Sequence, residues 1–215
     1  MKTLASKVLY YILLGVALLL VVPEFIRTIV YVGGHIKYYW YFFGGGALYA
    51  VAALTLLKTN LQYYQTKHHE SLHETACQIL LRPIESITAT SGKGGQLVHG
   101  GSSNLFITLA PYSFPVFTYF FLLIQLMVSP KFPYYALLTG FTFFFFLHAV
   151  YRQTGPRQPD LKRYGLPLSY MFIACFLLLN ISIILYAVKM NIWKGFLYYF
   201  EDIWRVVKGV LTTGF

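Results

Sequence analysis

The sequence predicts an all-α polytopic membrane protein, and its composition is the first observation that supports this fold class. Hydrophobic residues make up 57% of the 215-residue chain, whereas charged residues make up only 11%. Soluble domains contain about 25% charged residues, so most helices of this chain are expected to lie in lipid. The second observation is a series of long apolar runs separated by short polar segments, which predicts about five transmembrane helices in a single domain of residues 1–215.

The predicted spans share high hydropathy and few charges, and each approaches the length of about 20 residues that crosses the hydrocarbon core as a helix. They are expected at residues 8–32, 39–57, 104–128, 134–151 and 166–188. Gly44-Gly45-Gly46 in the second span predicts close packing against another helix. Pro111 and Pro115 predict an interruption of the third span, because proline removes a helical hydrogen bond.

Three other segments differ from an ordinary span. Residues 63–82 predict a helix so rich in His and Glu that we expect it to enter the membrane within the bundle without crossing it. Residues 84–101 predict a short β-hairpin around a Ser-Gly-Lys-Gly-Gly turn. Residues 191–211 alternate aromatic and charged side chains, which predicts an interfacial helix with Trp193 and Trp204 as anchors.

The distribution of charge predicts how the chain sits in the bilayer. The net charge of +10 favours basic loops at a cytoplasmic membrane surface, and no nucleic-acid-binding motif is present. If the 63–82 helix and the hairpin dip into the membrane and return, then the N-terminus and the basic 152–165 loop are both cytoplasmic. We therefore expect an integral membrane protein with its N-terminus on the cytoplasmic side. Cys77 and Cys175 lie in apolar helical context and are expected to be unpaired buried thiols.

The clearest motif is His69-Glu70-Ser71-Leu72-His73 within the polar helix. His69 and His73 are four residues apart, so their imidazoles face the same way on a helix and can bind one Zn²⁺. Glu70 is then placed to take a proton from a zinc-activated water. The alternative is a surface helix with chance histidines, but a charged cluster between apolar segments favours a membrane-embedded zinc protease.

A catalytic zinc usually takes three protein ligands and leaves one position for water, so a third ligand must come from elsewhere in the chain. Asp160 is favoured because it follows a proline, stands between two predicted spans, and is one of only two aspartates. The alternative for Asp160 is a solvated loop residue that pairs with Arg157 or Arg163. The other candidates for the third ligand are Glu74, Glu85, His99 and His148.

The motif also predicts a reaction. Glu70 would take the proton of the attacking water and pass it to the leaving amine of a cleaved peptide bond. The substrate, a transmembrane protein or peptide, would lie extended beside the hairpin, because a helix hides its carbonyl carbons from attack. Asn104 is a candidate for a polar contact with this substrate.

The chain resembles the site-2 protease family of intramembrane zinc metalloproteases, in its compact bacterial branch. The resemblance rests on the His69–His73 motif in a membrane helix and on the glycine-rich, strand-forming segment that follows it. It also rests on Leu109-Ala110-Pro111-Tyr112, which is similar to the small-residue and proline pattern that opens the corresponding helix of relatives. The resemblance covers about Gln62 to Leu185.

This resemblance implies a zinc ion bound by His69, His73 and an aspartate, with Glu70 as the general base. The family's Asn-Pro-Asp-Gly-like motif is absent here, and the nearest equivalent is Gln158-Pro159-Asp160-Leu161. An inactive relative that binds a metal or a partner without cleaving it is therefore an alternative. A di-iron hydroxylase is disfavoured because the chain has only six histidines, and a transporter because no internal repeat is visible.

Overall fold

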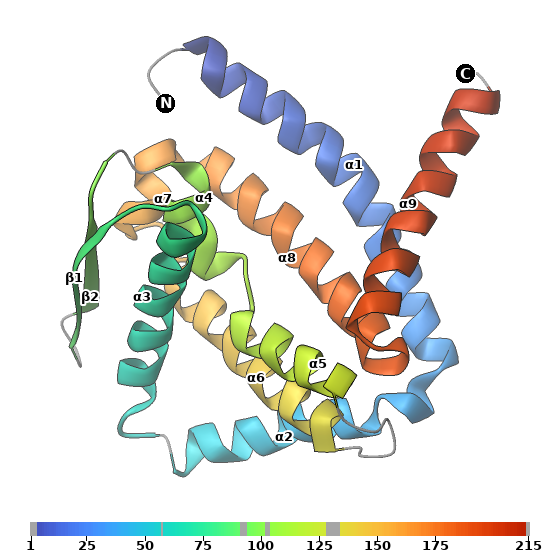
Figure 1. Ribbon diagram of the computed structural model, residues 1–215, viewed down its shortest axis with the longest axis horizontal. Coiled ribbons are helices and arrows are strands. Elements are labelled where there is room, and N and C mark those ends of the chain that lie inside the picture. Colours follow the sequence, from blue (N-terminus) through green and yellow to red (C-terminus); the bar gives the residue numbers. More distant parts are fainter. Residues whose placement is uncertain (1–3, 57, 91–93, 102–103, 128–133, 214–215) are drawn as a thin grey trace.

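The computed structural model describes residues 4–56, 58–90, 94–101, 104–127 and 134–213. The described chain is mostly helical and contains one two-stranded antiparallel sheet, in agreement with the predicted all-α class (Figure 1). In chain order the elements are α1 (Leu4–Gly34), η1 (Ile36–Tyr38), α2 (Trp40–Leu54), α3 (Leu61–Ile79), β1 (Ile84–Thr90), β2 (Gly94–His99), α4 (Leu105–Leu109), η2 (Ala110–Tyr112), α5 (Val116–Met127), α6 (Tyr134–Gln153), α7 (Pro159–Tyr164), α8 (Leu166–Met190) and α9 (Ile192–Thr213).

Three helices of the described chain, α1, α6 and α8, are long and apolar enough to cross a membrane. They coincide with the predicted spans 8–32, 134–151 and 166–188. These helices are compatible with a membrane protein, as the composition predicts.

The other two predicted spans take different forms. Helix α2 has 15 residues and is about 22 Å long, which is shorter than the hydrocarbon core of about 30 Å. The segment 104–128 is a pair of helical pieces, α4–η2 and α5, bent by 77°. The bend falls just before α5, because Pro115 has no N–H to donate and restricts the backbone of Phe114. Residues 57 and 128, at the ends of these predicted spans, lie outside the described residues.

Helix α3 carries the histidine motif and ends three residues before the predicted limit of residue 82. Leu81 takes a left-handed backbone conformation with φ of 53°, and the N–H of Arg82 donates to the carbonyl of Cys77 at 2.8 Å. This turn directs the chain into β1, which pairs with β2 in the predicted hairpin. The predicted glycine turn at its tip includes residues 91–93, which lie outside the described residues.

Helix α3 packs against several other parts of the chain. Leu72 packs against Phe146 and Val150 of α6, while Cys77 packs against Ile107 of α4. The hairpin lies along the outer side of α3 (Figure 1). On this helix the buried polar residues are Gln65, Thr66, His68, His69 and Glu70, whereas Gln62, Lys67 and Gln78 are exposed. Both cysteines, Cys77 and Cys175, are buried and free.

The segment between α6 and α8 contains a short helix, α7, where the sequence predicts a polar loop. Leu161 is 0% exposed and belongs to the cluster formed with α1, α4 and α8. The hydroxyl of Ser169 donates to the carbonyl of Leu161 at 2.9 Å. Burial of Leu161 therefore fixes α7 and, with it, the position of the neighbouring Asp160.

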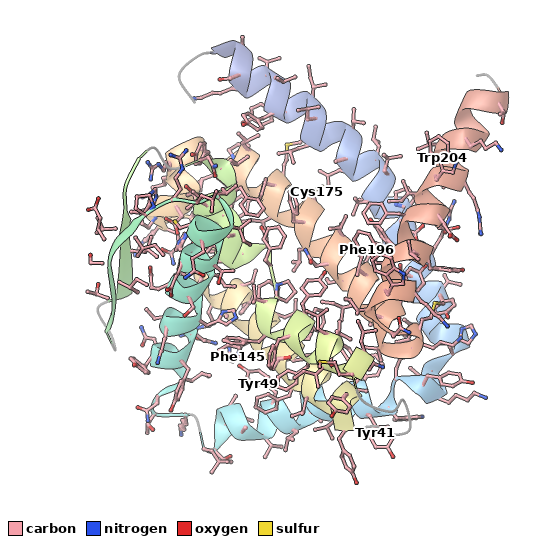
Figure 2. All side chains as sticks on the ribbon, in the orientation of Figure 1. Tyr41, Tyr49, Phe145, Cys175, Phe196 and Trp204 are labelled. Atoms are coloured by element: carbon pink, nitrogen blue, oxygen red, sulfur yellow. The ribbon has the colours of Figure 1, made fainter. Side chains whose placement is uncertain are left out.

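The C-terminal helix α9 has the predicted amphipathic character. Tyr199 is fully buried and packs against Ile183 and Tyr186 of α8. Trp193 and Trp204 are 64% and 62% exposed, and Figure 2 labels Trp204 on α9. Exposed tryptophans on an amphipathic helix are typical of a membrane interface, and that location for α9 stays a prediction.

Helices α2 and α6 cross at unusually close range. A Cβ added to Gly45 would overlap the carbonyl oxygen of Leu137, and a Cβ added to Gly140 would overlap the carbonyl oxygen of Phe42. Tyr49 and Phe145 lie together beside this crossing, with ring centroids 5.9 Å apart (Figure 2). The glycine run therefore permits close helix packing, as the sequence predicts.

We expect Gly45→Ala and Gly140→Ala to destabilise the protein by about 1–3 kcal/mol, because the added methyl group forces two backbones apart. At about 2–4 °C per kcal/mol for a chain of this size, each variant should melt at a lower temperature in detergent. Gly44→Ala is the matched control, since nothing lies within 4 Å of its Cβ position. Equal melting temperatures for Gly45→Ala and Gly44→Ala would contradict the proposed crossing.

Candidate metal centre

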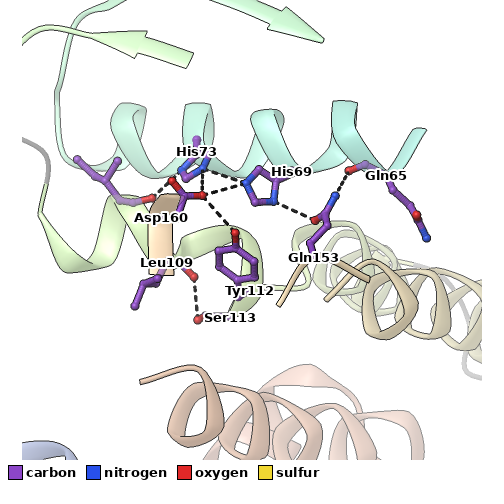
Figure 3. Close-up of polar contacts among 9 residues, drawn as sticks. Gln65, His69, His73, Leu109, Tyr112, Ser113, Gln153 and Asp160 are labelled. Carbon is purple, nitrogen blue, oxygen red and sulfur yellow. Dashed lines mark hydrogen bonds and ion pairs between the residues drawn. The ribbon is translucent and has the colours of Figure 1, made fainter. Parts of the chain in front are cut away.

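His69, His73 and Asp160 converge at one point between α3 and α7 (Figure 3). The Nε2 atoms of the two histidines are 3.2 Å apart. Asp160 Oδ2 lies 3.3 Å from His69 Nε2 and 3.4 Å from His73 Nε2. These three residues form a group that could hold a metal ion.

Each member of the group reaches this point for a local reason. His69 and His73 lie on successive turns of α3, so their side chains project from the same face. Asp160 lies in the first turn of α7, directly after Pro159. Within the described residues, the ion-pair partners of Asp160 are the two histidines and not an arginine.

His69 is oriented by an amide of α6. Its Nδ1 lies 2.9 Å from Oε1 of Gln153, and Nε2 of Gln153 donates to the backbone carbonyl of Gln65 at 3.2 Å. Because a carbonyl can only accept, the Gln153 amide must direct its NH₂ group toward Gln65 and its oxygen toward His69. His69 must then carry its proton on Nδ1, which leaves the Nε2 lone pair free for a metal.

The same logic applies to His73. Its Nδ1 donates to the carbonyl of Ile107 at 2.8 Å, so its Nε2 is also the free nitrogen. The N–H of Ile107 donates to Oδ1 of Asn104 at 2.8 Å. Asn104 thus caps α4 and fixes the peptide that orients His73.

Asn104 is not among the residues that line the cavity beside the metal group, so a direct substrate contact of Asn104 stays a prediction.

Asp160 has one further partner, because the hydroxyl of Tyr112 donates to its Oδ2 at 3.2 Å. Tyr112 is fully buried, and its ring centroid lies 5.1 Å from that of His69. Tyr112 comes from η2, in the bent segment between α4 and α5. The polar contacts around the metal group therefore come from four separate parts of the chain (Figure 3).

Burial and charge perturb the ionisable groups in opposite directions. Burial raises the pKa of Asp160, but its hydrogen bonds and charge interactions with His69 and His73 outweigh burial and hold the pKa well below its usual range. Burial lowers the pKa of His73, but the hydrogen bond and negative charge of Asp160 raise it above its ordinary value. A metal cation bound here would take the place of the proton between His73 and Asp160, because metal binding displaces protons from the ligands.

Glu70 lies on α3 beside His69 and is only 5% exposed. Burial raises the pKa of its carboxyl group, more than the neighbouring histidines lower it. The side chain lies against Gly95 of β2, where an added Cβ would come within 2.5 Å of Cγ and Oε1 of Glu70. The hairpin therefore covers Glu70, and Gly95 leaves the space that the carboxylate occupies.

A cavity of about 410 Å³ opens beside the metal group. This volume is more than ten times the roughly 30 Å³ share of one water in the liquid. Most of its lining side chains are polar or ionisable. The lining residues are Thr66, His69, Glu70, His73, Gly95, Leu97, His99, Ile107, Thr108, Gln153, Gln158, Pro159, Asp160 and Arg163.

The other candidates for a third ligand lie apart from the three ligand atoms within the described chain. His99 lines the cavity, and its Nδ1 faces the carbonyl of Gly100 at 3.2 Å. His148 accepts or donates a hydrogen bond with the hydroxyl of Tyr49 at 2.6 Å. Glu74 accepts from Gln78. Glu85 belongs to β1 and lies beside Gly100.

Sequence reasoning missed Gln153 and Tyr112. Gln153 is the last residue of α6, and a polar residue at the end of an apolar run is usually a solvated terminus. Tyr112 is one of 19 tyrosines, and the Leu109-Ala110-Pro111-Tyr112 pattern marks the start of a helix without indicating a role for the tyrosine hydroxyl. Only the approach of α6 and η2 to α3 reveals their roles.

No family model, curated protein or solved structure matches this chain. Its interpretation therefore rests on the geometry of the site and on the sequence motif.

We expect Gln153→Leu to weaken metal binding by roughly 10–100-fold, the usual effect of removing a partner of a metal-bound histidine. The variant loses the group that fixes the proton of His69 on Nδ1. Titration with Co²⁺, followed by its visible absorption, would measure the change. Gln158→Leu is the matched control, because Gln158 lines the same cavity and has no described contact with either histidine. Equal affinities of the two variants would contradict this role of Gln153.

Proposed function

We propose that this protein is an intramembrane zinc metalloprotease that resembles the site-2 protease family. The observation that carries the proposal is the spacing of the three ligand atoms, 3.2, 3.3 and 3.4 Å. Four ligands at zinc distances of about 2.0–2.1 Å form a tetrahedron with edges of roughly 3.3–3.4 Å. These spacings match three corners of such a tetrahedron, which supports zinc as the metal, and the fourth corner would be left for water or substrate.

The kinds of ligand also support zinc. Two neutral imidazoles and one carboxylate suit Zn²⁺, and three protein ligands are typical of its catalytic sites. Structural zinc sites instead use four protein ligands, and within the described chain no fourth His, Cys, Asp or Glu joins this group. The donor set thus favours catalysis over a structural role.

Zinc held by these residues would supply a Lewis acid that acidifies a water and polarises a peptide carbonyl. The proton transfers would be carried out by a residue of the chain. Glu70 receives the proton of the attacking water on its carboxylate and later transfers it to the leaving amine. Its pKa, raised by burial, brings the group closer to the operating pH, where proton transfer in both directions is most efficient.

The substrate that fits this site is an extended segment of a transmembrane protein or peptide. The metal group has partners from the end of the apolar helix α6 and from the bent apolar segment that contains η2. The hairpin beside it presents a sheet edge with which an extended chain can pair. We propose that the N-terminus and the active site face the cytoplasm of a bacterial inner membrane, since the 152–165 segment is basic. An inactive relative that binds a metal or a partner is the alternative, and the buried Glu70 favours the enzyme.

Elemental analysis of the detergent-purified protein tests the metal centre. We expect about one zinc per chain in the wild type, because a complete set of ligands is present. His73→Ala should lose the zinc, and Asp160→Asn should bind it more weakly, because a neutral amide replaces the carboxylate ligand. Absence of zinc from the wild type, even after incubation with Zn²⁺, would rule out the metalloprotease. Unchanged affinity in Asp160→Asn would assign the third ligand elsewhere.

Glu70→Gln tests catalysis separately from metal binding. We expect the variant to retain zinc and to cleave roughly 10²–10⁴-fold more slowly, the usual contribution of a general base. Cleavage would be followed by mass spectrometry on a panel of single-span membrane proteins, reconstituted with the enzyme in proteoliposomes. Glu74→Gln is the control, because Glu74 neighbours His73 in sequence but does not line the cavity. Full activity of Glu70→Gln would exclude Glu70 as the base.

A further inference from the structure

The charges on the cavity wall are unevenly distributed. Asp160 faces the two histidines, and Glu70 lies beside them under β2. Among the described residues that line the cavity, Arg163 alone carries a permanent positive charge. Both anionic groups have a role at the metal centre, which leaves the charge of Arg163 to be explained.

Arg163 has no carboxylate partner in the described part of the chain. Its side chain is solvent-accessible and lines the cavity. A guanidinium group offers a planar fork of N–H donors that matches a carboxylate in a bidentate pair. An unpaired arginine on the wall of a binding cavity is therefore suited to an anionic group of a ligand.

The position of Arg163 relative to the metal group follows from helix geometry. Arg163 is three residues after Asp160 on α7, so the two side chains leave the same face with Cβ atoms about 5–6 Å apart. An extended peptide advances at most about 3.3–3.6 Å per residue. A peptide whose carbonyl lies at the metal group would therefore reach Arg163 within one or two residues.

We propose that Arg163 forms a carboxylate-binding subsite of this cavity, and that the preferred substrates carry a carboxylate one or two residues from the cleaved bond. This inference rests on the proposed protease function. The carboxylate can be the side chain of Asp or Glu, or the free C-terminus of a short peptide. Gln158 and His99 line the same cavity and add polar groups around this subsite.

Peptide hydroxamates test the subsite without a known substrate, because the hydroxamate group chelates the zinc. The first pair consists of hydroxamoyl-Leu-Ala with a free C-terminal carboxylate and the same compound with a C-terminal carboxamide. The second pair consists of hydroxamoyl-Leu-Glu-amide and hydroxamoyl-Leu-Gln-amide. Dissociation constants would be measured by calorimetry on the full-length, zinc-loaded protein in detergent at low ionic strength.

We expect the wild type to bind the carboxylate member of at least one pair roughly tenfold or more tightly, as is usual for a hydrogen bond to a charged group. The pair that shows the preference identifies the source of the carboxylate. In Arg163→Gln the ratio should fall to about one, while the neutral members bind as in the wild type, which shows that the variant is folded. Lys162→Gln is the matched control, since Lys162 is on the same helix but does not line the cavity.

The outcomes separate this inference from the proposed function. Equal binding of both members of each pair by the wild type would overturn the subsite and leave the metal site intact. A preference that persists in Arg163→Gln would also overturn it. If none of the four compounds binds, the proposed zinc protease fails, and the subsite fails with it.

Discussion

The contact between Asp160 and the two imidazoles of α3 is the interaction on which the rest of the site depends. A carboxylate that is partly withdrawn from water is unfavourable unless it is paired and hydrogen-bonded. The Asp160 side chain is 25% exposed and has His69, His73 and Tyr112 as partners. The contact joins segments 91 residues apart in sequence. Leu161 of α7 is buried in a cluster with residues of α1, α4 and α8. This packing holds α7, and with it the Asp160 carboxylate, in position without a metal.

Two polar groups around the metal group come from the segment that the sequence predicts as the span 104–128. They are the carbonyl of Ile107 and the hydroxyl of Tyr112. The bend of 77° between the two halves of the 104–128 segment brings Tyr112 to the site, and the short helix α4 before it presents the carbonyl of Ile107. Irregular backbone at membrane depth is tolerated where it lines a cavity within the protein. The prolines that interrupt this segment therefore contribute to the site, because an unbroken helix would hide its carbonyls.

The cavity combines two electrostatic environments. Beside α3, the half-buried carboxylate of Asp160 and the imidazoles of His69 and His73 form a group that could hold a metal ion, and the hairpin covers the buried Glu70. At Arg163, the wall is positively charged and open to solvent. In the proposed protease, a peptide bound across both regions would have its carbonyl at the metal and a nearby carboxylate at the guanidinium group of Arg163. Together they offer a physical basis for both reaction and selectivity.

The sequence by itself determined the features that depend on local spacing and on hydropathy. The four-residue interval between His69 and His73 places both on one helix face, and three long apolar runs form helices able to cross a membrane. Only the tertiary structure decided that Asp160, and not His148 or His99, meets these histidines, and that Gln153 and Tyr112 orient the group. It also showed that α2 has 15 residues and is shorter than the three helices long enough to cross a membrane. The reason is physical, because helix periodicity acts over a few residues, whereas contacts between α3, α6 and α7 depend on how whole helices pack.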